Sequence, residues 1–214
     1  MIKSLTTYLE HRLKKELPGK EAHLEVAPYR RVEFTENDIQ QAKKSSVLIL
    51  FYHKNNTIYT ALMQRTRYKG SHSGQVSFPG GKAEPYDNSI LHTALREANE
   101  ELGINSNEVS IIGQLTEVYI PVSNFHVVPF IGITSKTPQF VLEKKEVEEV
   151  IELNIPYFVQ QQLTTNKVKM ANNTIVKVPS FEYEQKIIWG ATALMLNELK
   201  YILSDWDALN TFQP

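Results

Sequence analysis

The sequence predicts an α+β fold, with strands and helices mixed along a single domain at residues 1–214. Segments that alternate apolar and polar residues are interspersed with segments of helical period, without the regular strand–helix alternation of a doubly wound sheet. No internal repeat, low-complexity tract or linker marks a domain boundary. A chain of 214 residues can bury a sizeable core, which we place at about 45–204, after an N-terminal helical extension at 1–44.

The composition limits the class of protein. Hydrophobic residues make up 42% and charged residues 22% of the chain, which is typical of a soluble globular protein. The net charge of −1 gives no reason to expect a nucleic acid or a membrane surface as a partner. There is no cysteine, which excludes disulfides, thiolate metal sites and cysteine nucleophiles. No apolar run approaches the ~20 residues of a membrane span, so the cytoplasm is the expected location.

The N-terminal extension is expected to be helical. Apolar residues recur at helical spacing at Ile2, Leu5, Leu9, Leu13 and Leu17. Pro18 and Gly19 should end this first helix. In the segment TENDIQQAKK, at 35–44, Thr35 is a candidate N-cap and Asp38 stands at N3, so a second short helix is predicted.

A hairpin, a glycine turn and a longer helix follow. The β-rich runs at 45–53 and 57–65 are separated by a short polar break. A polar, basic loop then leads to a short strand at 75–81, whose last three residues, Pro-Gly-Gly, define a turn. The helix at about 88–102 has one apolar stripe, and Gly103 is its C-terminal stop.

The second half of the chain continues the mixture. Strands are predicted at 109–120, 126–134, 144–155, 166–170 and 174–181. A short helix is expected at 156–163, and an amphipathic helix within 186–203. Trp189 stands in an apolar context, so we assign it to the core; stacking on a base is the alternative.

The helix at 88–102 carries three glutamates close together. Glu97 and Glu101 form an i,i+4 pair on one face with Glu100 at its flank, and like charges at this spacing cost a few tenths of a kcal/mol. A positively charged group is therefore expected in front of this face. Carboxylates so arranged suit Mg²⁺ or Mn²⁺, which bind a few carboxylates, several waters and substrate phosphates. By itself, the glutamate-rich segment also fits a solvated helix face.

The order of these residues resembles the signature of the Nudix hydrolase family, G-x5-E-x7-R-E-U-x-E-E-x-G-U, where U is bulky and aliphatic. The matching residues are Gly81, Arg96, Glu97, Glu100, Glu101, Gly103 and Ile104. Ala98 occupies the first U position. Asp87 stands where the first Glu belongs, with eight residues between it and Arg96 in place of seven. The resemblance implies a Nudix-type α/β/α sandwich with a mixed β-sheet.

The segment before the glycines is similar to a further signature, that of the coenzyme A pyrophosphatase branch, L-L-T-x-R-[SA]-x3-R-x3-G-x3-F-P-G-G. The matches are Arg65, Gly74, Phe78, Pro79, Gly80 and Gly81. Met63 and Thr66 replace two residues of the pattern, and Gly70 stands where its second Arg belongs. Lys69 beside it offers a point charge but not the bidentate contact of an arginine. The likeness covers roughly 46–203.

The resemblance implies metal-dependent hydrolysis of a nucleoside diphosphate linked to another group. Glu97 and Glu101, with the carbonyl of Gly80, would hold Mg²⁺ or Mn²⁺, which activates a water. Glu100 would hydrogen-bond that water or bind a further ion. Many relatives take a base or ligand from a later loop, for which KKEVEEV offers Glu146, Glu148 and Glu149.

Glu146 and Glu149 are the preferred candidates in that loop, although a charged loop edge is an equal alternative for each of them. Further candidates come from the basic loop, which could clamp phosphates or be merely solvated. The candidate substrate-binding residues are Arg65, Arg67, Lys69 and His72.

The substrate implied by the resemblance is coenzyme A or a derivative, with adenosine 3′,5′-bisphosphate and 4′-phosphopantetheine or its acyl form as products. Gly70 favours the rival, a Nudix pyrophosphatase for ADP-ribose, nucleotide sugars or dinucleotides. A second alternative is a Nudix-like module that senses a nucleotide without cleaving it, although such a module would be expected to lose metal ligands. The expected partner is thus a small molecule, and the sequence leaves the oligomeric state open.

Overall fold

The structure is a computed structural model that describes residues 1–27, 35–68, 72–170, 173–207 and 209. The helices are α1 (Ile2–Arg12), α2 (Gly19–Val26), α3 (Glu36–Gln41), α4 (Ile90–Leu102), α5 (Ile155–Gln160) and α6 (Gly190–Ser204), with a 3-10 turn, η1, at Ser106–Glu108. The strands are β1 (Lys43–Lys54), β2 (Thr57–Arg65), β3 (Val76–Ser77), β4 (Gly80–Lys82), β5 (Ser110–Gln114), β6 (Val118–Ile120), β7 (Phe125–Ile133), β8 (Val147–Asn154), β9 (Thr164–Lys169), β10 (Ile175–Tyr183) and β11 (Lys186–Trp189).

The larger sheet is mixed. Its order is β3-β2-β1-β7-β5, and β4, β6 and β8 pair with β1, β7 and β2 respectively. β1 runs parallel to β7 but forms an antiparallel hairpin with β2, as predicted. Asn55 and Asn56, with φ of 48° and 59°, supply the left-handed residues that a two-residue hairpin turn requires. A smaller antiparallel sheet has the order β11-β10-β9.

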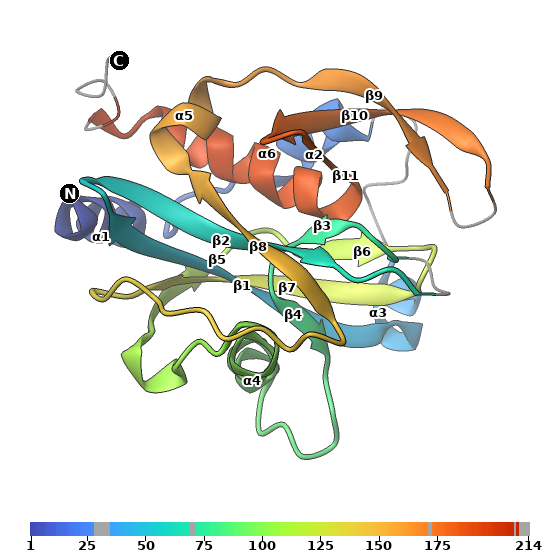
Figure 1. Ribbon diagram of the computed structural model, residues 1–214, viewed down its shortest axis with the longest axis horizontal. Helices are drawn as coiled ribbons and strands as arrows, with labels where there is room; N and C mark the ends of the chain where they lie inside the picture. Colours follow the sequence, from blue (N-terminus) through green and yellow to red (C-terminus); the bar gives the residue numbers. More distant parts are fainter. Residues whose placement is uncertain (28–34, 69–71, 171–172, 208, 210–214) are drawn as a thin grey trace.

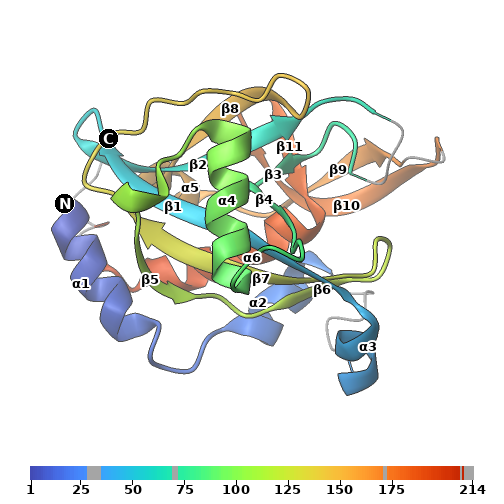
Figure 2. The ribbon, with the colours of Figure 1, turned by 90° about the horizontal axis from the view of Figure 1, so that it is seen from below.

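Helices cover both faces of the larger sheet (Figure 1). Strand β1 is buried on both sides because its side chains alternate: Leu48 and Leu50 pack toward the α4 side, and Ile49 and Phe51 toward α1 and α6. Each fully buried side chain of this kind contributes roughly 1.5–3 kcal/mol. Figure 2 shows α4 lying alone across one face, with α6 and α2 behind the sheet. This α/β/α arrangement confirms the predicted fold class.

The N-terminal segment differs from the prediction. α1 ends at Arg12, well before Pro18, and Gly19 opens the unpredicted helix α2 with a φ of 30°. The reason is that α2 depends on long-range contacts: the Asn197 side chain of α6 donates to the Ala22 carbonyl at 2.8 Å. Short helices gain most of their stability from such packing.

Of two further local predictions, the cap of α3 is confirmed and one long strand is divided in two. Thr35 caps α3 as predicted, and it forms a reciprocal capping box with Asp38. The run predicted as one strand at 109–120 is divided into β5 and β6, each of which pairs with β7. No helix of the described residues is long and apolar enough to cross a membrane.

The ends of α4 are set by local signals. The Ser89 hydroxyl accepts a hydrogen bond from the His92 amide at 3.0 Å and caps the first turn. Gly103 ends the helix with a left-handed φ of 70°. Strand β4 of the larger sheet pairs with β1 and packs against α4. The Pro-Gly-Gly segment, predicted only as a turn, is thereby brought beside the glutamates of α4.

Candidate active site

Arg96 of α4 joins two groups of carboxylates. Its Nε and Nη2 each donate to Asp87 at 2.9 Å. Its Nη1 donates to Glu97 Oε1 and Glu100 Oε2, also at 2.9 Å each. These bonds raise the pKa of Arg96 above its ordinary value, with Asp87 as the main cause. The guanidinium therefore supplies positive charge to Glu97 and Glu100 from within α4 itself.

Asp87 anchors the loop that precedes α4. Its side chain is only 2% exposed, and beyond Arg96 it accepts hydrogen bonds from the Glu84 amide, the Thr93 hydroxyl and His92. The bonds with Arg96 hold the pKa of Asp87 far below its usual range. The extra residue between Asp87 and Arg96 therefore does not prevent a bidentate contact between them.

Glu101 is a buried carboxylate that contacts one backbone amide and one guanidinium group. Its Oε2 accepts the Gly80 amide at 2.8 Å, and its Oε1 lies 3.2 Å from Nη1 of Arg65. Burial raises the pKa of Glu101 to about 8 despite these contacts, and the negative charges of Glu97 and Glu146 add to the rise. An ionised Glu101 thus needs more positive charge than Arg65 supplies.

Glu97 lies directly against Gly81. A Cβ at Gly81 would stand 2.4 Å from the carboxyl carbon of Glu97, so only glycine leaves room for this carboxylate. Gly80 is required for another reason: its φ is 155°, and a Cβ there would meet the Ser46 carbonyl at 2.3 Å. Burial raises the pKa of Glu97, and Arg96 opposes that rise.

Gly81→Ala should reduce turnover by displacing the Glu97 carboxylate, at little cost in stability because the side chain that must move is flexible. Gly74→Ala is the matched control. It strains a residue with φ of 66°, but its Cβ meets only the Arg67 side chain at 3.6 Å. Steady-state kinetics and thermal melts of both variants test this. Equal, small losses of turnover would show that Gly81 is an ordinary loop residue.

The other candidate glutamates, Glu146, Glu149 and Glu100, have different surroundings in the structure. Glu146 lies 3.9 Å from Nη2 of Arg65 and is close enough to Glu97 and Glu101 to raise the pKa of each. Glu149 instead forms an ion pair with Lys186 of β11. Glu100 is about half exposed and is held by Arg96. Of the two preferred loop candidates, Glu146 therefore approaches the buried carboxylates and Glu149 does not.

The acidic side chains fit a hard divalent cation that is only partly coordinated by protein. Among the described residues, no three His, Asp or Glu side chains converge closely enough to hold a metal ion by themselves. The mutual repulsion of Glu97, Glu101 and Glu146 nevertheless favours a cation between them. Mg²⁺ and Mn²⁺ complete their shells with water and substrate phosphates, so an incomplete protein cage suits them. The contact between Gly80 and Glu101 is made by the Gly80 amide, which donates to the carboxylate, and not by the Gly80 carbonyl.

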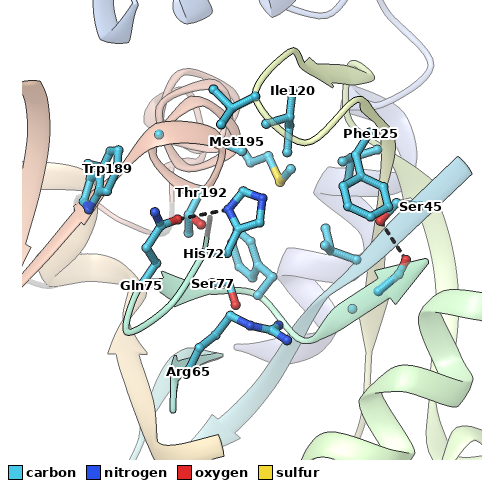
Figure 3. Close-up of a pocket in the computed structure, with 18 of the residues that line it drawn as sticks. Ser45, Arg65, His72, Gln75, Ser77, Ile120, Phe125, Trp189, Thr192 and Met195 are labelled. Carbon is cyan, nitrogen blue, oxygen red and sulfur yellow. Dashed lines mark hydrogen bonds between the residues drawn. The ribbon is translucent and has the colours of Figure 1, made fainter. Parts of the chain in front are cut away.

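A cavity of about 360 Å³ lies on the α6 side of β4 (Figure 3). Most of its lining is apolar, including Phe125 of β7 and Met195 of α6. His72 projects into it, with its ring nitrogens 3.2 Å from Gln75 Oε1 and 3.1 Å from Ser123 Oγ. Figure 3 shows Arg65 and Ser77 together at one side of the cavity.

The cavity adjoins the carboxylates through shared residues. Arg65, Gly80 and Gly81 all line the cavity, and the same residues contact Glu101 or Glu97. Arg65 ends β2 at an irregular point of the sheet: Gln64 lies opposite Glu149 and Arg65 opposite Val147, so Glu148 is an extra residue in β8. The cavity and the carboxylates are therefore adjacent, with Arg65, Gly80 and Gly81 between them.

Trp189 was assigned to the core from its sequence context, and this is wrong. Its side chain is half buried and lines the cavity, because β11 is an edge strand of the smaller sheet. Arg67 does not line this cavity; it lines a second one beside it. Lys69 and Gly70 lie outside the described residues.

Several lining residues had not been identified from the sequence. They come from segments far apart in the chain and include Ser45, Ser77, Ile120, Phe125, Thr192 and Met195. No local pattern distinguishes them from ordinary strand and helix residues, because only the packing of α6 and β6 over the sheet brings them together. In the sequence, the apolar residues among them show the same periodicity as the residues of the core.

Comparison with known proteins identifies the family. A family model described as the NUDIX domain matches residues 42–170. The chain belongs to the Nudix family. The Nudix hydrolase NudL of Pectobacterium atrosepticum is 30% identical over 178 residues, which cover 78% of this chain and 86% of the relative. NudL of Yersinia enterocolitica is 36% identical over 140 residues, covering 64% of this chain and 70% of the relative.

A solved structure agrees with the family fold. The MutT/nudix family protein of Enterococcus faecalis superposes with a TM-score of 0.52 at 13% identity, over 94% of this chain and 73% of its own. This likeness supports the fold alone. With the family match and the relatives named as hydrolases, the chain is a Nudix pyrophosphohydrolase, an enzyme class that acts on nucleotide-type small molecules with divalent ions.

Proposed function

We propose that this Nudix enzyme hydrolyses the pyrophosphate bond of coenzyme A or its derivatives in the presence of Mg²⁺ or Mn²⁺. The products would be adenosine 3′,5′-bisphosphate and 4′-phosphopantetheine or its acyl form. The observation that carries the proposal is the shared wall: Arg65, Gly80 and Gly81 separate a mostly apolar cavity from the buried carboxylates. A substrate with a pyrophosphate next to a nucleoside can occupy both at once.

The cavity has the properties of a nucleoside site. Trp189 and Phe125 offer aromatic surface to a base, and polar groups of the lining can orient it. Among the described residues, Ser77 Oγ and Arg65 Nε are buried and have no hydrogen-bond partner. Buried polar atoms are nearly always satisfied, so these two atoms are suited to meet polar groups of a ligand.

Each charged side chain then has a proposed task. A bound divalent ion would neutralise pyrophosphate oxygens and lower the pKa of a water for attack on phosphorus. Glu97 and Glu101, with Gly80, would hold that ion. When the bound ion takes over the charge of Glu101, Arg65 would be free to bind the phosphate oxygens through two parallel hydrogen bonds of its guanidinium group.

Glu146 is the preferred general base. It is the loop glutamate that approaches the buried carboxylates, and it is more than half exposed, so it can exchange its proton with solvent. Glu100 would orient the water or bind a further ion. Glu149 is a weaker candidate because Lys186 already neutralises it.

Coenzyme A should be cleaved faster than dephospho-coenzyme A, by about tenfold, because one charge-assisted contact to the 3′-phosphate contributes on the order of 1.5–3 kcal/mol. The lower end of that range is expected because Gly70 replaces a further arginine of the signature. Turnover of both compounds is compared with that of ADP-ribose and diadenosine polyphosphates, with Mg²⁺ and with Mn²⁺. Arg67→Ala should reduce the preference. Rapid turnover of ADP-ribose with neither form of coenzyme A cleaved would establish the rival substrate class.

A further inference from the structure

A second cavity adjoins the nucleoside cavity. It has a volume of about 970 Å³ and lies between the β2–β3 connection and the smaller sheet. Both cavities are lined by Tyr68, Gln75, Met170 and Trp189. The half-buried Trp189 therefore borders both spaces, and a ligand lying against it can reach from one to the other.

The second cavity is lined by positive charge. Of the described residues that line it, four are cationic, Arg67, Lys167, Lys169 and Lys186, and one, Glu148, is acidic. This is a local concentration, since the whole chain has a net charge of −1. Lys186 is paired with Glu149, but the other three cations form no ion pair within the described part of the chain.

The placement of the lysines does not serve the hairpin itself. Lys167 and Lys169 are exposed and stand two residues apart, on the same face of β9. Lys177 of β10 is directly opposite Lys167, and like charges in that position destabilise a strand pair. The positions of Lys167 and Lys169 are therefore not explained by the stability of the hairpin.

We infer that the second cavity binds a phosphate carried by the nucleoside of the substrate, in addition to the pyrophosphate. Phosphate is the anion that fits best, because arginine can bind it bidentately and lysines add point charges. The inference rests on the proposed function, in which the base lies against Trp189 and the pyrophosphate lies beside Arg65. In coenzyme A the additional group is the 3′-phosphate.

The test measures binding without catalysis. Metal-free protein is titrated calorimetrically with adenosine 3′,5′-bisphosphate and with adenosine 5′-monophosphate, which differ only in the 3′-phosphate. Wild type should bind the bisphosphate at least about tenfold more tightly, the smaller end of the range for charge-assisted hydrogen bonds. The double variant Lys167→Gln/Lys169→Gln should bind the two compounds within about threefold of each other.

The single variant Lys167→Gln should weaken the preference in part. Lys177→Gln is its matched control, because it removes one positive charge from the same hairpin at a position that does not line the cavity. It should keep the wild-type preference. Equal binding of the two compounds by wild type would overturn the inference, and so would a loss in Lys177→Gln as large as in the double variant. Melting temperatures check that each variant is folded.

A separate assay of coenzyme A hydrolysis distinguishes this inference from the proposed function. Cleavage of coenzyme A with no preference for the bisphosphate would overturn the phosphate site alone. Preference for the bisphosphate without cleavage of coenzyme A would overturn the proposed function and leave the phosphate site supported.

Discussion

Glu101→Gln should abolish most of the turnover while raising the melting temperature of the metal-free protein at pH 8. Substituting a residue that only holds a metal ligand in place typically lowers activity roughly 10–100-fold. The loss of turnover in Glu101→Gln should be larger, because Glu101 is proposed to contact the ion itself. The gain in stability follows from its environment: burial raises the pKa of Glu101 to about 8, so the carboxylate is held in its charged form only at a cost.

The pH dependence has a definite sign. The folded protein keeps the Glu101 proton up to about pH 8, whereas the unfolded chain releases it near the ordinary value of about 4.3. Between these values rising pH favours unfolding, so Glu101 lowers the stability of the metal-free protein progressively from pH 4.3 to 8. Glutamine removes this dependence. A gain of about 1 kcal/mol would appear as roughly 2–4 °C in Tm.

Thermal melts from pH 5 to 8.5, with and without Mg²⁺, measure both effects. Mg²⁺ should stabilise wild type at pH 8 by mass action and should stabilise Glu101→Gln much less. The exposed Glu182→Gln on β10 serves as the control and should behave as wild type. Turnover of Glu101→Gln near the wild-type value would contradict the metal assignment, and an unchanged melting temperature would contradict the argument from burial.

Asp87→Asn should destabilise the protein by about 3 kcal/mol, the lower part of the range for breaking a buried ion pair. Asp87 is 2% exposed and accepts two hydrogen bonds from Arg96, whose side chain is 11% exposed. Arg96 keeps Glu97 and Glu100 as partners in the variant, which limits the loss. Because Arg96 would no longer be fixed, Glu97 should be less well positioned and turnover should fall as well.

Urea unfolding at pH 7 and at pH 3 tests this prediction. The pKa of Asp87 is lowered in the folded state, so its contribution is present above the unfolded value of about 3.9 and is lost as the pH falls through the folded value. The difference between wild type and variant should therefore shrink in acid. Glu84→Gln, which removes a nearby surface charge, should change stability by less than about 0.5 kcal/mol. A similarly small effect of Asp87→Asn would mean that Arg96 is anchored sufficiently by its other bonds.

Elements with strong local signals could be predicted from the sequence. α4 has a cap at each end and an apolar stripe between them, and both signals depend on residues within a few positions of one another. The β1–β2 hairpin likewise follows from two β-rich runs and the short polar break between them. The spacing of the glutamates on α4 placed the acidic face correctly, because the helical period fixes which residues share a face.

The sequence did not identify what lies opposite that face. Arg65 reaches Glu101 from the end of β2, and Gly80 reaches it because β4 pairs with β1. In the sequence, Glu146 and Glu149 are two glutamates of the same acidic segment, and nothing local distinguishes them. Tertiary structure alone turns one toward the carboxylates and pairs the other with Lys186.

By itself, then, the sequence determined the fold class, the glutamate helix and the resemblance of its signature to the Nudix family, since these rest on short-range periodicity and spacing. The tertiary structure decided the helix α2, the position of Trp189 beside the cavities and the two adjoining cavities themselves. These features arise where segments more than a hundred residues apart pack together, as Ala22 does with Asn197. Such contacts depend on the burial of whole elements against each other, which no local pattern of residues specifies.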